Sequence, residues 1–176
     1  MFVKKATAAE LDARKKEFAD AFGDYEEVTD LPVKEYMIKW LSAFAPDMTF
    51  SDAKSFCLPR LMYRNYIWHA FSFQKTDCFI DEDAEASFKN GFEGPAYVLF
   101  NTENLLLKVE NGSVFNPENV KNFKNLIIFK TDFSETYVNT GNDEFGPFYK
   151  SADMAEADDS EPEEAEVPEE ETEEAE

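Results

Sequence analysis

The sequence predicts an α+β fold in which N-terminal helices pack on a mostly antiparallel sheet of about five strands, followed by a disordered acidic tail. Helical patterns come first, strand-like stretches follow from residue 66, and the composition changes abruptly after residue 150. At 176 residues the chain suffices for one domain with a hydrophobic core but not for two. We therefore expect a single globular domain over residues 1–150 and a disordered tail over residues 151–176.

Two amphipathic helices are predicted in the N-terminal part of the chain. The first is predicted over residues 7–22, where Thr7 and Glu10 have the spacing of a capping box. The second is predicted over residues 30–45, with Asp30 as its cap and Pro32 in its first turn. Its apolar residues recur at helical spacing, at Val33, Met37, Trp40, Leu41 and Phe44. A short third helix is predicted from Ser51 to about residue 56.

The stretch Tyr66–Phe73 is dense in aromatic and branched residues, which favours a central strand covered on both faces. On a strand, His69 and Ser72 would point to opposite faces. Further strands are predicted at 96–101 and 105–110, forming a hairpin, and at 125–130 and 134–139. Short helices are expected from Asp81 or Asp83 and from Pro117, and the ordered part is expected to end near residues 146–149.

Charge is distributed unevenly along the chain. The formal net charge is −21, but residues 151–176 hold 14 acidic residues and no Lys or Arg, which leaves −7 for residues 1–150. This balance argues against binding to nucleic acid or to an anionic membrane surface. It suits a basic protein partner. The tail is interpreted either as a solubilising segment or as a clamp or nucleic-acid mimic that binds a basic partner.

The expected compartment is the cytoplasm. The N-terminus, with Lys4 and Lys5, has no apolar signal-peptide core, and no stretch approaches the ~20 apolar residues of a membrane helix. The two cysteines, Cys57 and Cys78, fit a reducing compartment, and a disulfide between them stays open as an alternative.

His69, the one histidine, is the first candidate for chemistry, with Ser72, Asp77 and Cys78 close by in sequence. Since a strand directs Ser72 away from His69, we favour a buried core histidine over a catalytic pair. Neither zinc-ligand spacing nor a phosphate-binding glycine loop is present. The acidic residues 81–83 lack the pattern of an EF-hand, and we expect no metal and no cofactor.

Two segments resemble a bacterial family known only as a domain of unknown function. The first is Ile67-Trp68-His69-Ala70-Phe71-Ser72, and the second runs from Asp132 to Thr140 and continues with Gly146-Pro147-Phe148-Tyr149. The resemblance covers about residues 30–150. Where the family pattern has His-Glu after the threonine, this chain has Gly141-Asn142. The resemblance implies that Trp68, His69, Tyr137 and Thr140 are neighbours that line a shared core or cleft, and we take them as the candidate binding residues.

The preferred hypothesis is a non-enzymatic cytoplasmic protein-binding module, of the immunity type that neutralises a partner. The first alternative is a small hydrolase-like enzyme that uses His69, with Tyr137, Ser72 or Cys78 assisting. The second alternative is an acidic nucleic-acid mimic that acts through the tail.

Overall fold

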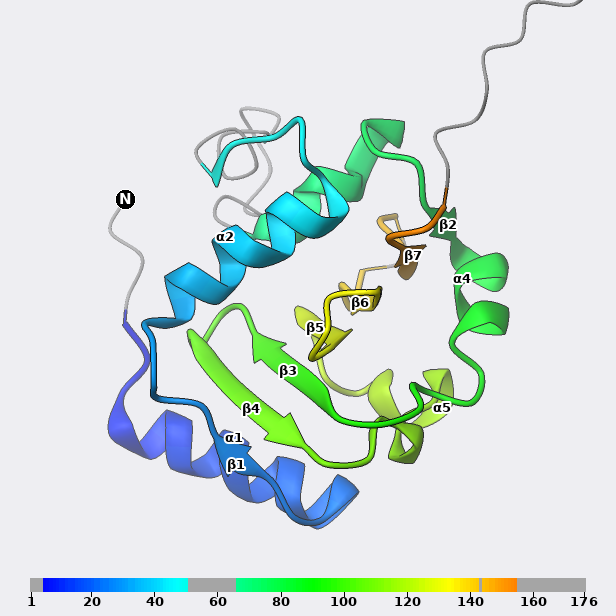
Figure 1. The fold of residues 1–176 in the computed structure, drawn as a ribbon. Helices are drawn as coiled ribbons and strands as arrows, with labels where there is room; N and C mark the ends of the chain where they lie inside the picture. Colours follow the sequence, from blue (N-terminus) through cyan, green and yellow to red (C-terminus); the bar gives the residue numbers. More distant parts are fainter. Residues whose placement is uncertain (1–4, 51–65, 143, 155–176) are drawn as a thin grey trace, which may run out of the picture.

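A seven-stranded antiparallel sheet forms the centre of the molecule (Figure 1). The computed structural model describes residues 5–50, 66–142 and 144–154. The helices are α1 (Ala8–Phe22), α2 (Val33–Phe44), the 3₁₀-helix η1 (Ile67–Gln74), α4 (Asp81–Ser87), the 3₁₀-helix η2 (Gly112–Val114) and α5 (Pro117–Val120). The strands are β1 (Glu26–Glu27), β2 (Phe79–Ile80), β3 (Ala96–Phe100), β4 (Leu105–Val109), β5 (Leu126–Lys130), β6 (Glu135–Asn139) and β7 (Phe148–Ser151).

The strand order is β1-β4-β3-β5-β6-β7-β2, and every neighbouring pair is antiparallel. The predicted α+β class and the antiparallel sheet are confirmed, and so are the four predicted strands that correspond to β3, β4, β5 and β6. The sheet has seven strands instead of about five. Three of them, β7 and the two-residue strands β1 and β2, were not predicted, and the strand predicted at residues 66–73 does not form. Two residues are too few to show a period-two pattern.

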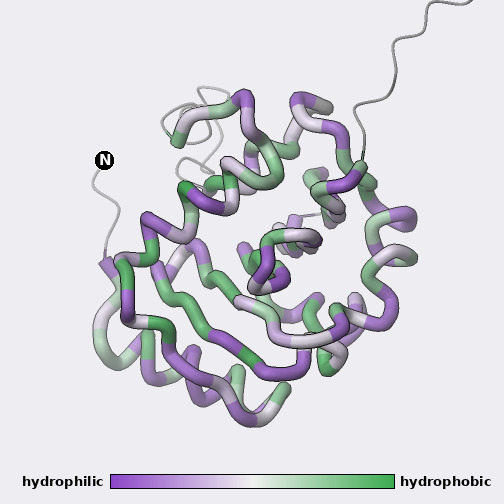
Figure 2. Tube along the Cα trace, in the orientation of Figure 1, coloured by the Kyte–Doolittle hydropathy of each residue, from purple (hydrophilic) through white to green (hydrophobic). Residues whose placement is uncertain are grey.

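Residues alternate between two cores on the two faces of the sheet. One face packs against α2 and η1, with Leu99, Ile127 and Val138 pointing into it. The other face carries α1, α4 and α5, with Val98 and Ile128 pointing into it. Figure 1 shows α2 on one side of the sheet and α1, α4 and α5 on the other. Hydrophobic residues concentrate in the strands, whereas the outer turns of the helices are mainly hydrophilic (Figure 2).

The first two helices begin differently. In α1 both bonds of the predicted capping box are present, because Thr7 Oγ1 accepts from the Glu10 N–H and the Glu10 side chain accepts from the Thr7 N–H. Asp30 does not cap α2, which begins at Val33 without a side-chain cap bond. The Asp30 carboxylate instead accepts a 2.9 Å hydrogen bond from the Tyr36 hydroxyl. Four of the five predicted core residues of α2 are buried, and Val33 packs at the edge of the same core.

The central strand predicted at Tyr66–Phe73 is wrong. Residues 67–74 form η1, which lies against α2, with the Trp40 and Phe71 ring centres 5.1 Å apart. The physical reason is that Ile67–Ser72 is buried at every position, so no polar face reveals the period. A short stretch that is buried throughout fits a strand and a helix equally well.

Some predictions lie outside the described residues, namely the helix at 51–56, Cys57 and residues 155–176 of the tail. Cys78 is a free thiol. In the part of the chain that the structure describes, no helix combines the length and the apolar character needed to cross a membrane.

Candidate functional site

The 3₁₀ geometry of η1 brings His69 and Ser72 together. Residues three apart lie on the same side of such a helix, whereas they face opposite ways on a strand. Nδ1 of His69 lies 3.2 Å from Oγ of Ser72. The prediction that Ser72 points away from His69 is therefore wrong, and it follows directly from the wrong secondary structure.

Aromatic rings enclose His69. Its ring centre is 4.2 Å from that of Trp68, 6.1 Å from Phe145 in an edge-on arrangement and 6.4 Å from Tyr66. Only 1% of His69 is exposed, and Ser72 is fully buried. A serine and an imidazole within hydrogen-bond reach have the spacing of a nucleophile and its base, but a substrate would have to reach them. In this conformation the contact between His69 and Ser72 is part of the packing of the core.

Two asparagines tie η1 to one end of the sheet. Oδ1 of Asn101, just after β3, accepts from the Ile67 N–H at 3.0 Å. Oδ1 of Asn125, just before β5, accepts from Nε1–H of Trp68 at 3.3 Å. Asn125 has a positive φ of 57°, a conformation that asparagine tolerates better than most residues. The sequence reasoning missed both residues, although their position at the ends of predicted strands was a usable signal.

Thr140, just after β6, connects the sheet to the His69 cluster. Its hydroxyl donates to the Phe145 carbonyl and accepts from the Asn142 N–H at 3.2 Å. These bonds hold the turn from which the Phe145 ring reaches His69 and Trp68. Thr140 thus acts on His69 through Phe145, by positioning it.

Gly141 is required by the backbone of this turn. Its φ is +68°, and a Cβ at this position would lie 2.4 Å from Cγ and 3.1 Å from Cα of Lys124. A side chain here would therefore be strained and crowded. The glycine at position 141 therefore suits this turn.

Tyr137 points to the opposite face of the sheet. Its ring stacks on Phe88, with centres 4.0 Å apart and planes 10° apart. Burial raises the pKa of its hydroxyl, and the nearby Glu85 carboxylate adds to this effect. Its neighbour Thr136 points the other way, where its Oγ1 accepts from Nε1–H of Trp40 at 2.9 Å.

The four candidate residues therefore divide into two groups. Trp68, His69 and Thr140 belong to one cluster, whereas Tyr137 lies across the sheet from it. The expected common neighbourhood of all four does not form. Thr140 and Tyr137 are three residues apart on an extended segment, so the alternation of a strand already separates them. Among the described residues, no group of three His, Cys, Asp or Glu side chains could hold a metal ion.

A second feature lies at the β2 edge of the sheet, where Phe79 is 42% exposed. Its ring stacks on Tyr149 of β7, with centres 6.1 Å apart and planes 11° apart. Cys78, the preceding residue, packs towards the α2 face, and its burial raises the thiol pKa to about 11. Phe79 was not among the predicted site residues, although the signal was present as an aromatic residue between Asp77 and the acidic residues 81–83.

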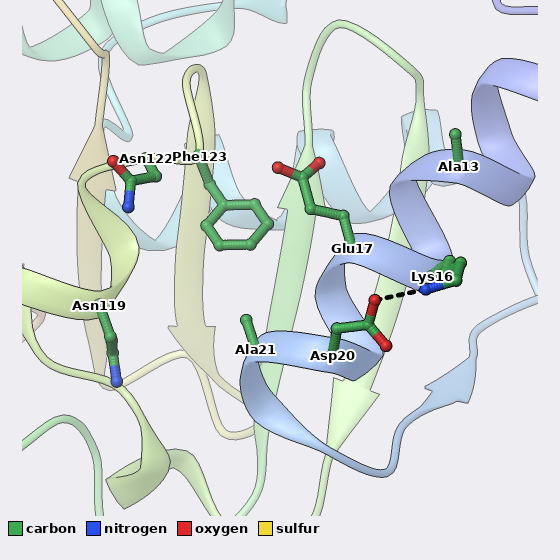
Figure 3. A pocket seen from close by; sticks show the side chains of 8 residues that line it. All are labelled: Ala13, Lys16, Glu17, Asp20, Ala21, Asn119, Asn122 and Phe123. Carbon is green, nitrogen blue, oxygen red and sulfur yellow. Dashed lines mark hydrogen bonds and ion pairs between the residues drawn. The ribbon is translucent and has the colours of Figure 1, made fainter.

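A groove of about 560 Å³ lies between α1 and the α5 segment (Figure 3). Lys16, Glu17 and Asp20 line it on α1, opposite Asn119, Asn122 and Phe123. Its charges are already neutralised, because Lys16 pairs with Asp20 at 2.6 Å and Glu17 pairs with Arg14 at 2.6 Å. The groove therefore offers little net attraction to a charged partner.

Comparison with known proteins identifies the family of the chain. The model of the family described as a domain of unknown function (DUF4275) matches residues 27–149. The match spans well over half of the chain, so the chain belongs to this family. It includes η1, β2 and α4 but not α1. No curated protein and no solved structure matches the chain.

Proposed function

We propose that this member of the family is a non-enzymatic protein-binding module of the cytoplasm whose partner is a basic protein. More specifically, we propose a module of the immunity type, which neutralises its partner by covering it. The surface charge of the described domain and the burial of its one histidine support it.

The observation that carries the proposal is the exposed acidic surface of α4. Asp81, Glu82, Asp83 and Glu85 are all exposed on this helix. The ion pairs between described residues lie elsewhere, on α1, β1, β4, α5 and the β5–β6 hairpin, and none includes an α4 carboxylate. Exposed carboxylates that are not engaged in ion pairs favour the approach of a basic partner and speed its association.

The enzyme alternative draws on the His69–Ser72 distance of 3.2 Å. Its weakness is burial, since both side chains are at least 99% buried. A serine-reactive fluorophosphonate probe tests it. Labelling of the wild-type protein that is lost in both His69→Gln and Ser72→Ala would favour the enzyme, whereas the binding proposal expects no labelling at Ser72.

The binding proposal is tested by cross-linking and affinity capture with two baits. One is the full chain, and the other is the full chain with Glu82→Lys, Asp83→Lys and Glu85→Lys. We expect a basic protein that the first bait captures and the second does not. Its affinity for the full chain, measured with the purified partner, should fall as salt rises.

Two results would count against the proposal. One is the absence of any direct protein partner. The other is a purified partner whose affinity changes neither with salt nor with the three substitutions. Circular dichroism of the substituted chain is the control for folding.

A further inference from the structure

We infer that the basic partner docks on the β2 edge of the sheet through an arginine-rich segment, and that Phe79 is the anchor on which a guanidinium group stacks. This inference rests on the proposed function and assigns it a surface. We call the group of Asp77, Phe79 and the first-turn carboxylates of α4, together with the buried Tyr149 that supports Phe79, the Phe79 surface.

An aromatic row leads from the core to this edge. Tyr137 is paired with Tyr149 across β6 and β7, and Tyr149 is paired with Phe79 across β7 and β2. Exposure rises along the row from 2% to 8% to 42%. Phe79 is thus the most exposed of the large hydrophobic side chains in the described part of the chain. Its ring rests on Tyr149, which holds it in place with one side open.

A ring held in this way is a suitable anchor. The stack on Tyr149 restricts its side-chain rotamers before binding, so less side-chain entropy is lost when a partner covers it. Aromatic side chains are also among the residues that contribute most to binding energy at protein interfaces. An isolated exposed phenylalanine would need no explanation, but here it stands among carboxylates.

The charges around the Phe79 ring determine which kind of partner can bind. Asp77 precedes Phe79 by two residues, and Asp81, Glu82 and Asp83 come after Ile80, at the start of α4. The chain also leaves the described domain at this edge, because β7 pairs with β2 and ends at Ser151 (Figure 1). The sequence beyond, residues 155–176, has 13 acidic residues and no basic one.

This charge disfavours two of the three possible occupants. A second copy would bring the same carboxylates against its own, and the acidic C-terminal segment of the chain would be repelled in the same way. A cationic segment of another protein remains. Arginine fits better than lysine, because its planar guanidinium stacks on an aromatic face while its N–H groups bind carboxylates.

The test is a fluorescence-anisotropy titration of the full chain with two labelled nine-residue peptides, one alternating Arg and Ser and the other alternating Lys and Ser. We expect the arginine peptide to bind more tightly. Phe79→Ala should weaken its binding about fivefold, an effect within the range of a single cation–π contact. The matched control is Leu31→Ala, which removes a side chain of similar exposure, 39%, remote in sequence from this edge and should leave the affinity unchanged.

Phe79→Leu serves as a second variant, because it keeps an apolar side chain and removes only the ring. We expect it to weaken the arginine peptide as Phe79→Ala does, with the circular dichroism spectrum unchanged. In the chain shortened to residues 1–154 overall affinity should fall, and the dependence on Phe79 should persist.

The outcomes separate the two proposals. Tight binding that is weakened by the three α4 substitutions but not by Phe79→Ala or Phe79→Leu would overturn the Phe79 surface and leave the binding module intact. Equal binding of the arginine and lysine peptides would also overturn it. If neither peptide binds, the docking surface fails, and the capture experiment with cross-linking decides separately whether the protein-binding function survives.

Discussion

Trp68 and Phe79 are both aromatic side chains that stack on a tyrosine, and they differ in what surrounds them. Trp68 is fully buried between His69, Phe145 and Phe148, and its indole N–H has a polar partner in Asn125. Phe79 has one ring against it and is 42% exposed.

The contrast shows that a chemically capable side chain and a functional surface need not coincide. The His69 cluster has the residue types of an active site, but its polar atoms are used within the fold. The β2 edge instead combines an open aromatic face with carboxylates. Substitutions in the His69 cluster should therefore affect mainly stability, and substitutions of Phe79 should affect mainly binding.

The largest difference is expected between Trp68→Ala and Phe79→Ala. Loss of the buried indole should lower the free energy of unfolding by about 3–5 kcal/mol, because it leaves a cavity among aromatic side chains. Loss of the Phe79 ring removes one stacking contact and should cost about 1 kcal/mol. Urea denaturation followed by far-UV circular dichroism measures both. Equal losses for the two variants would contradict the division into a closed and an open region.

The second prediction concerns the buried pair. Ser72→Ala should lower the free energy of unfolding by about 1–3 kcal/mol, because Nδ1 of His69 loses a buried hydrogen-bond partner. Ser42→Ala is the matched control. Ser42 is exposed and its hydroxyl donates to the Ile38 carbonyl at 3.0 Å, so we expect a change within about 0.5 kcal/mol. A Ser72→Ala variant that is as stable as the wild type, or more stable, would show that the contact between His69 and Ser72 does not stabilise the fold.

The sequence predicted the parts of this fold whose pattern is local. The capping box at Thr7 and Glu10 and the apolar spacing of α2 are visible in a short window of sequence, because each depends only on residues that are close together in the chain. The strands β3 to β6 carry dense branched and aromatic residues between turn signals, and so they were also predicted. Asp30 was assigned as a cap because of its position, but its carboxylate binds the Tyr36 hydroxyl, a contact decided by the fold.

The site was less predictable because its residues meet through tertiary packing. Residues 67–72 have no exposed side, so strand and 3₁₀-helix could not be told apart, and the relation of His69 to Ser72 was reversed. Tyr137 and Thr140 could have been separated from the sequence alone, by counting along the strand. The exposure of Phe79 depends on β2 lying at the end of the sheet, which no local pattern contains.

Cys78 tests whether β2 is firmly attached at its edge. Burial raises its thiol pKa from 9.0 to about 11, with Asp77 adding to the rise and Lys150 opposing it. In a Cys57→Ser background we expect alkylation of Cys78 at pH 8 to be at least about tenfold slower in the native protein than in urea, because less thiolate is present. Equal rates would mean that β2 detaches readily.

The same pKa rise has a consequence for stability. Folding favours the neutral thiol, so this contribution is fully present below pH 9 and is lost as the pH rises through about 11. Comparing Cys78→Ala with the wild type in urea at pH 8 and at pH 10.5 measures it. The stability difference between the two proteins should shift in favour of the alanine variant at the higher pH.

The smallest effect is expected for Tyr149→Phe. This substitution removes the hydroxyl of Tyr149 and keeps the ring that supports Phe79. The hydroxyl donates to Oε1 of Glu135 at 2.6 Å, and Glu135 is also paired with Lys130 at 3.3 Å. Since the carboxylate keeps that cation, the substitution should cost only about 0.5–1 kcal/mol in urea denaturation. It keeps the ring, so affinity for the arginine peptide should not change, whereas Tyr149→Leu should weaken binding by removing the support of Phe79. If Tyr149→Phe weakens binding as much as Tyr149→Leu, the hydroxyl and not the aromatic stack shapes this edge.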